Sequence, residues 1–226
     1  YKTFPEYQKV NVNMTLSEFK SIFFWEYLHR MLGRLIGLCI IFPYFYFLIK
    51  KQLSKPLIFR GAIMIILILA QGVMGWYMVK SGLVDNPGVS HFRLAAHLLL
   101  AFFLLQYILW TLYSILWRKP TQEKTYYPII YGVSWGITGL VFFQIMVGAF
   151  VSGLDAGYGY NTFPKMGTEW FPEAGLMLDS LWKNLLYNPV MIQFIHRTLA
   201  WMVVGAVLLF CIYSAQFSLT TFQKRA

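Results

Sequence analysis

The chain has 226 residues, of which 58% are hydrophobic and only 12% are charged. A soluble domain carries about 25% charged residues, so this composition excludes an ordinary water-soluble protein and indicates an integral membrane protein. The formal net charge of +10 therefore bears first on membrane topology. Nucleic acid is not an expected partner, because the Lys and Arg residues stand in short clusters between apolar runs.

The predicted elements begin with segment 1–21, which is expected to approach the membrane along its outer surface with aromatic residues at headgroup level. Each of the five segments that follow can cross about 30 Å of hydrocarbon, which takes about 20 helical residues. They are 22–49, 60–80, 93–117, 127–152 and 191–217. The sequence thus predicts an all-α integral membrane protein, a polytopic transmembrane helix bundle.

The connections between these segments alternate in charge. The connections 50–60 and 118–124 are basic, as is the C-terminal tail, whereas 81–89 and 153–190 carry few bases. Because Lys and Arg concentrate in loops on the inner side of a membrane, the basic connections and the C-terminus are expected in the cytoplasm or matrix. The connection 153–190 is expected outside. Its Gly, Pro and aromatic residues favour a folded cap over a site, and a loop without a function is the alternative.

Two cysteines, Cys39 and Cys211, stand inside apolar segments far apart in the sequence. We expect both to be buried, unreactive thiols. Neither a disulfide nor a cysteine metal site is predicted.

Three of the four histidines stand at corresponding places, because His29, His97 and His196 each lie near the start of a segment that enters from the predicted outer side. About 21 residues, or about 31 Å of helix, separate His29 and His97 from the basic residue at the far end of each segment. Both histidines are therefore expected near the outer boundary of the bilayer. His91 stands in the loop before its helix and is expected at the rim.

Each of these histidines has an arginine close to it in the sequence. The arginines are Arg30 and Arg34 after His29, Arg93 one turn before His97, and Arg197 directly after His196. Imidazole can be an axial ligand of haem iron, and Arg can pair with the haem propionates. A lone histidine in a spanning helix is usually a hydrogen-bonded structural residue, but three at matching depth beside Arg favour haem ligation between helices.

The intervening helices share a second pattern. Segments 70–85 and 143–157 both contain a Gln, a Gly four residues later, and then Ser-Gly-Leu and an Asp. Close helix packing is one interpretation of the small residues. The pattern is also an internal repeat, in which histidine helices alternate with Gln/Gly helices. In this alternation His196 has no partner before residue 226.

These residues resemble haem A synthase, a family of membrane enzymes that oxidise haem O for terminal oxidases. The resemblance is carried by "MTLSEFKSIFFWEYLHRMLGR", "QGVMGWYMVKSGL", "VSHFRLAAHL", "GAFVSGLDAGYGYNTFPKMG" and "QFIHR", in family order. It implies an eight-helix protein of two four-helix halves. This chain, which starts at Tyr1 without an initiator Met, is then expected to be a piece with helices two to six. It would be one membrane domain, 1–226, with 22–117 in the N-terminal half and 127–217 in the C-terminal half.

The resemblance also implies roles for individual residues. His29 and His97 would be the ligand pair of the N-terminal half, where haem O is the substrate and haem A the product. His196 would be one ligand of a haem b in the C-terminal half. Glu26 matches the family's essential acidic residue. The arginines that are candidates for the propionates are Arg30, Arg34 and Arg93.

The resemblance further implies a reaction and a location. One haem methyl would become a formyl group, with an oxygen atom from water. The portion present lacks the cysteine pair of some bacterial members, which is typical of the group found in proteobacteria and mitochondria. The bacterial inner membrane is therefore expected, with the mitochondrial inner membrane as the alternative. Expected partners are the lipid bilayer and haem O. Further candidates are a haem O synthase, an electron-transfer partner and a second copy of the chain.

Glu26 lies three residues before His29, so the two share a helical face. Its carboxylate could stabilise positive charge at the macrocycle edge or take a proton from attacking water, and the sequence leaves this choice open. A structural salt bridge to Arg30 or Arg93 is the alternative.

Two other function classes compete with a synthase. A b-type dihaem electron-transfer cytochrome would need the histidines and arginines but no acid beside a ligand. A transporter with a His/Glu proton relay would explain the charged groups but not the arginine beside each histidine.

Overall fold

The computed structural model describes residues 2–3, 5–9, 11–82, 88–116 and 127–217. Of the predicted charge pattern, the basic connection 118–124, the last residues of the C-terminal tail and most of the connection 81–89 lie outside the described residues.

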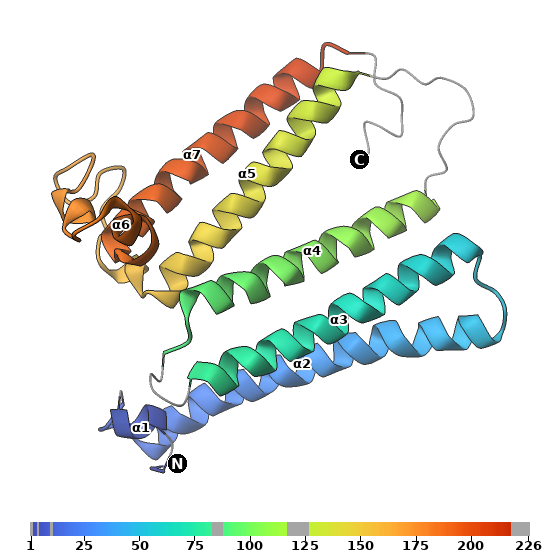
Figure 1. The fold of residues 1–226 in the computed structure, drawn as a ribbon, viewed down its shortest axis with the longest axis horizontal. Helices are drawn as coiled ribbons and strands as arrows, with labels where there is room; N and C mark the ends of the chain where they lie inside the picture. The colour runs from blue at the N-terminus through green and yellow to red at the C-terminus, as the bar shows by residue number, and fades with distance from the viewer. Residues whose placement is uncertain (1, 4, 10, 83–87, 117–126, 218–226) are drawn as a thin grey trace. The chain divides into compact units, whose positions relative to one another are not determined.

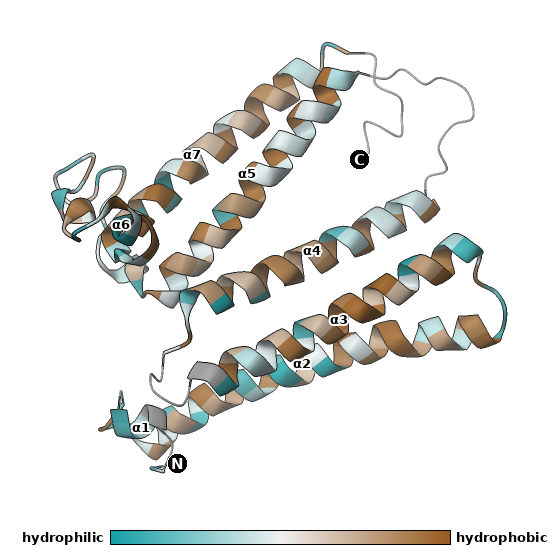
Figure 2. Ribbon diagram, in the orientation of Figure 1, coloured by the Kyte–Doolittle hydropathy of each residue, from teal (hydrophilic) through white to brown (hydrophobic). Residues whose placement is uncertain are grey.

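The described part of the chain is all-α (Figure 1). Its helices are α1 (Pro5–Lys9), α2 (Leu16–Ile49), α3 (Lys55–Gly82), α4 (His91–Leu116), α5 (Pro128–Gly153), η1 (Ala156–Tyr158), η2 (Glu173–Leu176), α6 (Leu181–Tyr187) and α7 (Pro189–Ser214). Within the described residues, the five longest helices, α2, α3, α4, α5 and α7, are long and apolar enough to cross a membrane, and Figure 2 shows their apolar residues along their lengths. The predicted polytopic membrane fold is thereby confirmed.

The helix α2 begins at Leu16, six residues before the predicted span. A capping box explains this start: the Thr15 hydroxyl accepts the backbone N–H of Glu18 at 3.3 Å, and the Glu18 carboxylate accepts the backbone N–H of Thr15 at 2.8 Å. Segment 16–21 is therefore the first part of the long helix rather than a separate approach to it.

The chain divides into two compact units, and α4 contributes residues to both. One unit comprises Tyr1–Arg93 with Leu100–Thr111, and the other comprises Leu94–Leu99 with Leu112–Ala226. We refer to them as the N-terminal and the C-terminal unit. The predicted division into halves at 22–117 and 127–217 stays a prediction.

In the N-terminal unit, α2 and α3 pack against each other in opposite directions. A Cβ atom at Gly61 would overlap the ring of Tyr44, whose hydroxyl donates a hydrogen bond to the carbonyl of Ile58 at 3.2 Å. Seven residues later on α3 and seven residues earlier on α2, a Cβ atom at Gly37 would lie 3.9 Å from Cγ1 of Ile68. Two contacts in step along both helices fix an antiparallel register.

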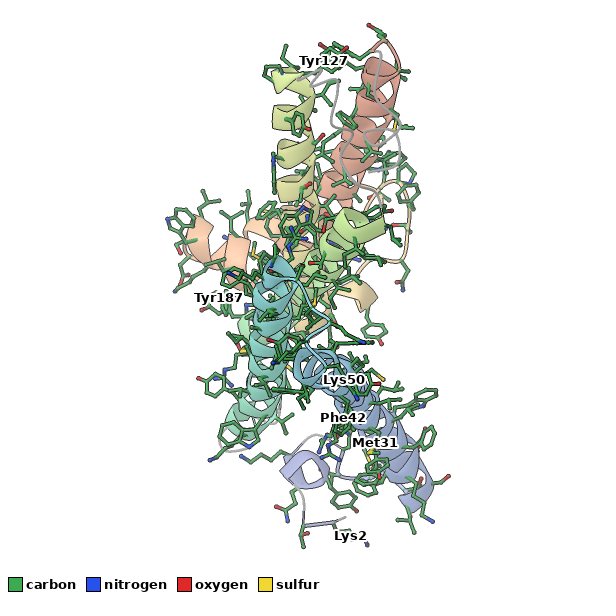
Figure 3. All side chains as sticks on the ribbon, turned by 90° about the vertical axis from the view of Figure 1, so that its right-hand side faces the viewer. Lys2, Met31, Phe42, Lys50, Tyr127 and Tyr187 are labelled. Carbon is green, nitrogen blue, oxygen red and sulfur yellow. The ribbon has the colours of Figure 1, made fainter. Side chains whose placement is uncertain are left out.

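The helix α2 has no buried side chain along its described length. Figure 3 shows its side chains projecting from the ribbon, among them Met31 and Phe42, which is 66% exposed. Such a surface suits lipid or further protein and not water.

In the C-terminal unit, α5 and α7 lie side by side (Figure 1), and a buried apolar cluster joins them to the start of α4. The cluster consists of Ala95 from α4, Val147, Ala149 and Phe150 from α5, and Ile192 and Leu199 from α7. Because the connection from α5 to α7 leaves from this end of the pair, the core lies directly beside it.

The connection between α5 and α7 is folded onto the start of α7. The Asn184 side chain is 1% exposed and donates hydrogen bonds to the carbonyls of Leu178 and Ser180 at 2.9 and 3.0 Å. The Asn188 side chain donates to the carbonyl of Ala174 at 2.9 Å and accepts the backbone N–H of Val190, which caps α7. Buried side-chain amides thus satisfy the irregular backbone here.

The prediction that Cys39 and Cys211 are buried is wrong, because both are exposed and free. An apolar run around a cysteine shows that its helix is apolar, but it does not show which side of the helix packs. A small thiol that faces lipid has no desolvation cost to avoid.

Candidate functional site

His196 of α7 lies against Gly148 of α5. A Cβ atom at Gly148 would stand 3.0 Å from Cε1 of the imidazole, 3.6 Å from Nδ1 and 3.8 Å from Nε2. The ring thus occupies space that any larger residue on α5 would need. Nδ1 of His196 is buried and has no hydrogen-bond partner among the described residues. A buried polar atom without a partner costs about 1–3 kcal/mol, so it calls for a ligand or a specific role.

Gln144 reaches the same residue from one turn away on α5. Its side-chain Nε2 donates a hydrogen bond to the backbone carbonyl of His196 at 3.1 Å. Both members of the Gln/Gly motif of α5 therefore contact His196. The sequence showed the histidine and the motif as separate patterns, and the structure brings them together.

Two further side chains of α7, Gln193 and Arg197, hold the folded connection on either side of His196. Gln193 is 6% exposed and donates to the carbonyl of Tyr160 at 2.9 Å. Arg197 donates from Nη1 to the carbonyl of Lys165 at 3.5 Å and from Nη2 to the carbonyl of Thr162. The guanidinium of Arg197 thus donates to two carbonyls of the folded connection. Sequence reasoning missed Gln193, although its place one turn before His196 was a usable signal.

An aromatic pair completes this attachment. The Arg197 guanidinium lies 5.9 Å from the ring centroid of Phe163, and Phe163 stacks on Trp201 of α7 with ring centroids 5.8 Å apart. Residues 160–166 are therefore held by α7 over two turns of helix, at the level of His196.

The candidate residues of α2 include an ion pair. The Glu26 carboxylate accepts a hydrogen bond from Nη2 of Arg30 at 2.9 Å, and the two side chains are 51% and 52% exposed. His29 stands on the same helix and is exposed. Nη1 of Arg34 lies 3.6 Å from the sulfur of Met31. The salt bridge that was the structural alternative for Glu26 is present.

Two basic residues, Lys80 of α3 and Arg93 of α4, lie over aromatic rings of α3. The Arg93 guanidinium stands 5.4 Å from the ring centroid of Tyr77, and the Lys80 ammonium stands 4.8 Å from that of Trp76. Such cation–π contacts orient a cation without neutralising its charge.

His91 differs from expectation, because α4 begins at this residue and its side chain is only 6% exposed. The prediction that His91 stands in the loop before its helix is wrong, and its place at the rim of the site stays a prediction. Its ring centroid lies 4.1 Å from that of Phe92.

The structure does not place His29 relative to His97, because they belong to different units. His97 stands in the part of α4 that joins the C-terminal unit, between Ala95 of the buried cluster and Leu98, which packs against it. The pairing of His29 with His97 stays a prediction.

The fold and site define a polytopic α-helical membrane protein in which a Gln/Gly motif on one spanning helix contacts a histidine on the next. The chain belongs to the COX15-CtaA family of cytochrome oxidase assembly proteins, whose model matches residues 1–225.

Relatives of the chain are named alike. It is 44% identical over 204 residues to Heme A synthase of Nitrosospira multiformis, which is 89% of this chain and 57% of the relative. It is 40% identical over 228 residues to Heme A synthase of Flavobacterium johnsoniae, which is 99% of this chain and 66% of the relative. Heme A synthase of Ehrlichia canis is 44% identical over 202 residues, 88% of this chain and 57% of the relative. The chain thus spans less than two thirds of these relatives' length. No solved structure matches it.

Proposed function

We propose that the chain is part of a haem A synthase, which oxidises a methyl group of haem O to the formyl group of haem A for terminal oxidase biogenesis. One observation carries this proposal: the family model matches residues 1–225, a range that includes every candidate residue from Glu26 to His196. Relatives that share about two fifths of the residues over nearly the whole chain bear that enzyme's name.

His196 would hold a haem b through its imidazole. The structure offers two features that fit this group: a buried imidazole nitrogen without a partner among the described residues, and a glycine whose missing side chain leaves room for the ring. A bound haem b would supply one-electron transfer at this place. Arg197 would contribute indirectly, since it holds residues 160–166 beside the histidine.

The substrate haem O would be bound by His29 and His97, with its propionates near Arg34 and Arg93. Arg30 is also a candidate, but it would first have to leave the Glu26 carboxylate. Glu26 would take the proton that the attacking water sheds. The guanidinium of Arg30 lies beside this carboxylate, 2.9 Å away. Water would supply the oxygen atom, and an electron-transfer partner would accept the electrons that each oxidation releases.

The proposal includes a location. The enzyme would lie in a bacterial inner membrane, or in the mitochondrial inner membrane, with its histidines towards the outer face and the connection 153–190 outside. A haem O synthase would be a fitting partner because it makes the substrate, and a homo-oligomer is a further candidate.

Extraction of pigment from the purified full-length protein tests the function. Haem O together with haem A supports a synthase. Haem B alone would indicate an electron-transfer cytochrome, and a preparation without haem would indicate a transporter.

A further inference from the structure

We propose that Gln144 and Gly148 of α5 are positioning residues for His196, which together set the place and the orientation of its imidazole. This inference rests on the proposed role of His196 as a haem ligand. It adds two residues that would act on the haem through His196. Groups behind a ligating histidine commonly fix its orientation and tune the metal.

Gly148 acts through the space that it leaves. A Cβ atom would lie 3.0 Å from Cε1 of His196, closer than side chains normally approach, so the ring would have to move. Other glycines of α5 differ, because Cβ atoms at Gly132, Gly136 and Gly139 would meet nothing within 4 Å. Glycine at 148 is therefore matched to the imidazole, and Gly132, Gly136 and Gly139 provide controls on the same helix.

Gln144 acts on the backbone. Its Nε2 donates to the carbonyl of His196 itself, so the hydrogen bond joins α5 and α7 at the residue that bears the imidazole. A hydrogen bond between spanning helices limits the sliding and rotation of one helix against the other. With the ring held against Gly148 and the main chain held by Gln144, His196 has two independent attachments to α5.

The internal repeat suggests the same arrangement, a Gln and a Gly that position a histidine, in the N-terminal unit. There α3 carries Gln71 and Gly75 with the same spacing. The contacts of Gly61 with Tyr44 and of Gly37 with Ile68 are seven residues apart on each helix. A further step of seven residues brings Gly75 level with Arg30, the residue after His29. We therefore expect Gln71 and Gly75 to position His29 as Gln144 and Gly148 position His196.

The first experiment compares glycine variants in full-length protein by electron paramagnetic resonance of its low-spin haem. Gly148→Ala should shift the g values, because the added methyl group displaces the ring by a few tenths of an ångström. Gly139→Ala makes the same chemical change on the same helix, and it should leave the signal unchanged. Equal behaviour of these two variants would overturn the role of Gly148.

The second variant tests Gln144 with little change in volume. Gln144→Leu should retain haem but change its g values and its midpoint potential, because His196 can then rotate. An unchanged spectrum and potential would overturn the role of Gln144.

The extension to α3 is tested with a second pair of glycine variants. Gly75→Ala should reduce retention of haem O and Gly72→Ala should not, since a Cβ atom at Gly72 meets nothing within 4 Å. Equal retention would overturn the extension to α3.

A third measurement needs no haem, so it separates this inference from the proposed function. Thermal unfolding of haem-free full-length protein is measured for Gly148→Ala, His196→Ala and the double variant. The change in Tm that Gly148→Ala causes should differ clearly between the wild-type protein and the His196→Ala background, where the ring is gone. Additive effects would overturn the contact. Coupling in a protein that never holds haem would contradict only the haem function.

Discussion

The Glu26 carboxylate and the Arg30 guanidinium form an ion pair, with Nη2 of Arg30 2.9 Å from Oε2 of Glu26, one turn apart on α2. Both side chains are about half exposed. The pair holds a carboxylate one turn from His29 on the same helix, where the proposed reaction needs one.

Glu26→Ala is expected to separate chemistry from binding. Because His29 and His97 would hold haem O, the full-length variant should copurify with haem O yet form haem A about 10²–10⁴-fold more slowly, the usual share of a general acid or base. Glu26→Gln should behave alike if the charge matters. The haem content and the rate of haem A formation are measured together.

Arg30→Gln is the matched control for this pair, since it breaks the ion pair and keeps the acid. It should reduce the rate less than Glu26→Ala does. Normal haem A formation by Glu26→Ala would return Glu26 to a structural role. If Glu26→Ala loses both its bound haem and its activity, Glu26 is an ion-pair residue.

His196→Ala is expected to remove one low-spin haem b from the absorption spectrum of full-length protein, while the protein still inserts in the membrane. His91→Ala provides the control, because His91 is also buried but is not a predicted ligand. If the spectrum of His196→Ala equals that of the wild type, His196 is not a ligand.

Arg197→Ala is expected to loosen residues 160–166. The substitution removes the hydrogen bonds of the guanidinium to the carbonyls of Thr162 and Lys165. Proteolysis in this segment should therefore be faster, by up to about tenfold, since cleavage follows the population of opened chain.

Lys183→Ala is the control for this measurement. Lys183 pairs with Asp179 at 3.2 Å on the exposed part of the same connection, where such pairs contribute little. Cleavage rates that are equal in both variants would show that Arg197 does not hold the segment.

The predicted topology can be tested with single cysteines in full-length protein that lacks Cys39 and Cys211. A cysteine at Lys183 should react with a membrane-impermeant maleimide from outside the cell. A cysteine at Lys55 should react only after the membrane is permeabilised. The reverse labelling pattern would invert the topology and place the histidines at the inner face.

The spanning helices could be predicted because a run of about 20 apolar residues has few alternatives to a transmembrane helix. The exact start of α2 was not predicted, because segment 1–21 was expected to approach the membrane along its outer surface, whereas the capping box starts the helix at Leu16. The exposure of Cys39 and Cys211 was also missed. In a helix that is apolar all round, the sequence does not show which side packs against protein.

The candidate site was predictable residue by residue but not as an arrangement. The spacing of Gln144 and Gly148 was visible as a repeat, and His196 was visible as a histidine near a helix start. That they meet depends on which helices pair and in which register, and this follows from the packing of Ile192, Val147 and their neighbours. The attachment of Arg197 to loop carbonyls likewise depends on the fold of the connection.

The most direct test of the central claim uses a bacterial host that makes haem O and has no haem A. The full-length protein is expressed there, and the haems of the membranes are extracted and separated by chromatography. A haem A synthase predicts that haem A appears with the wild-type protein and is nearly absent with Glu26→Ala. Membranes that contain well-expressed, inserted wild-type protein and still only haems B and O would contradict the claim.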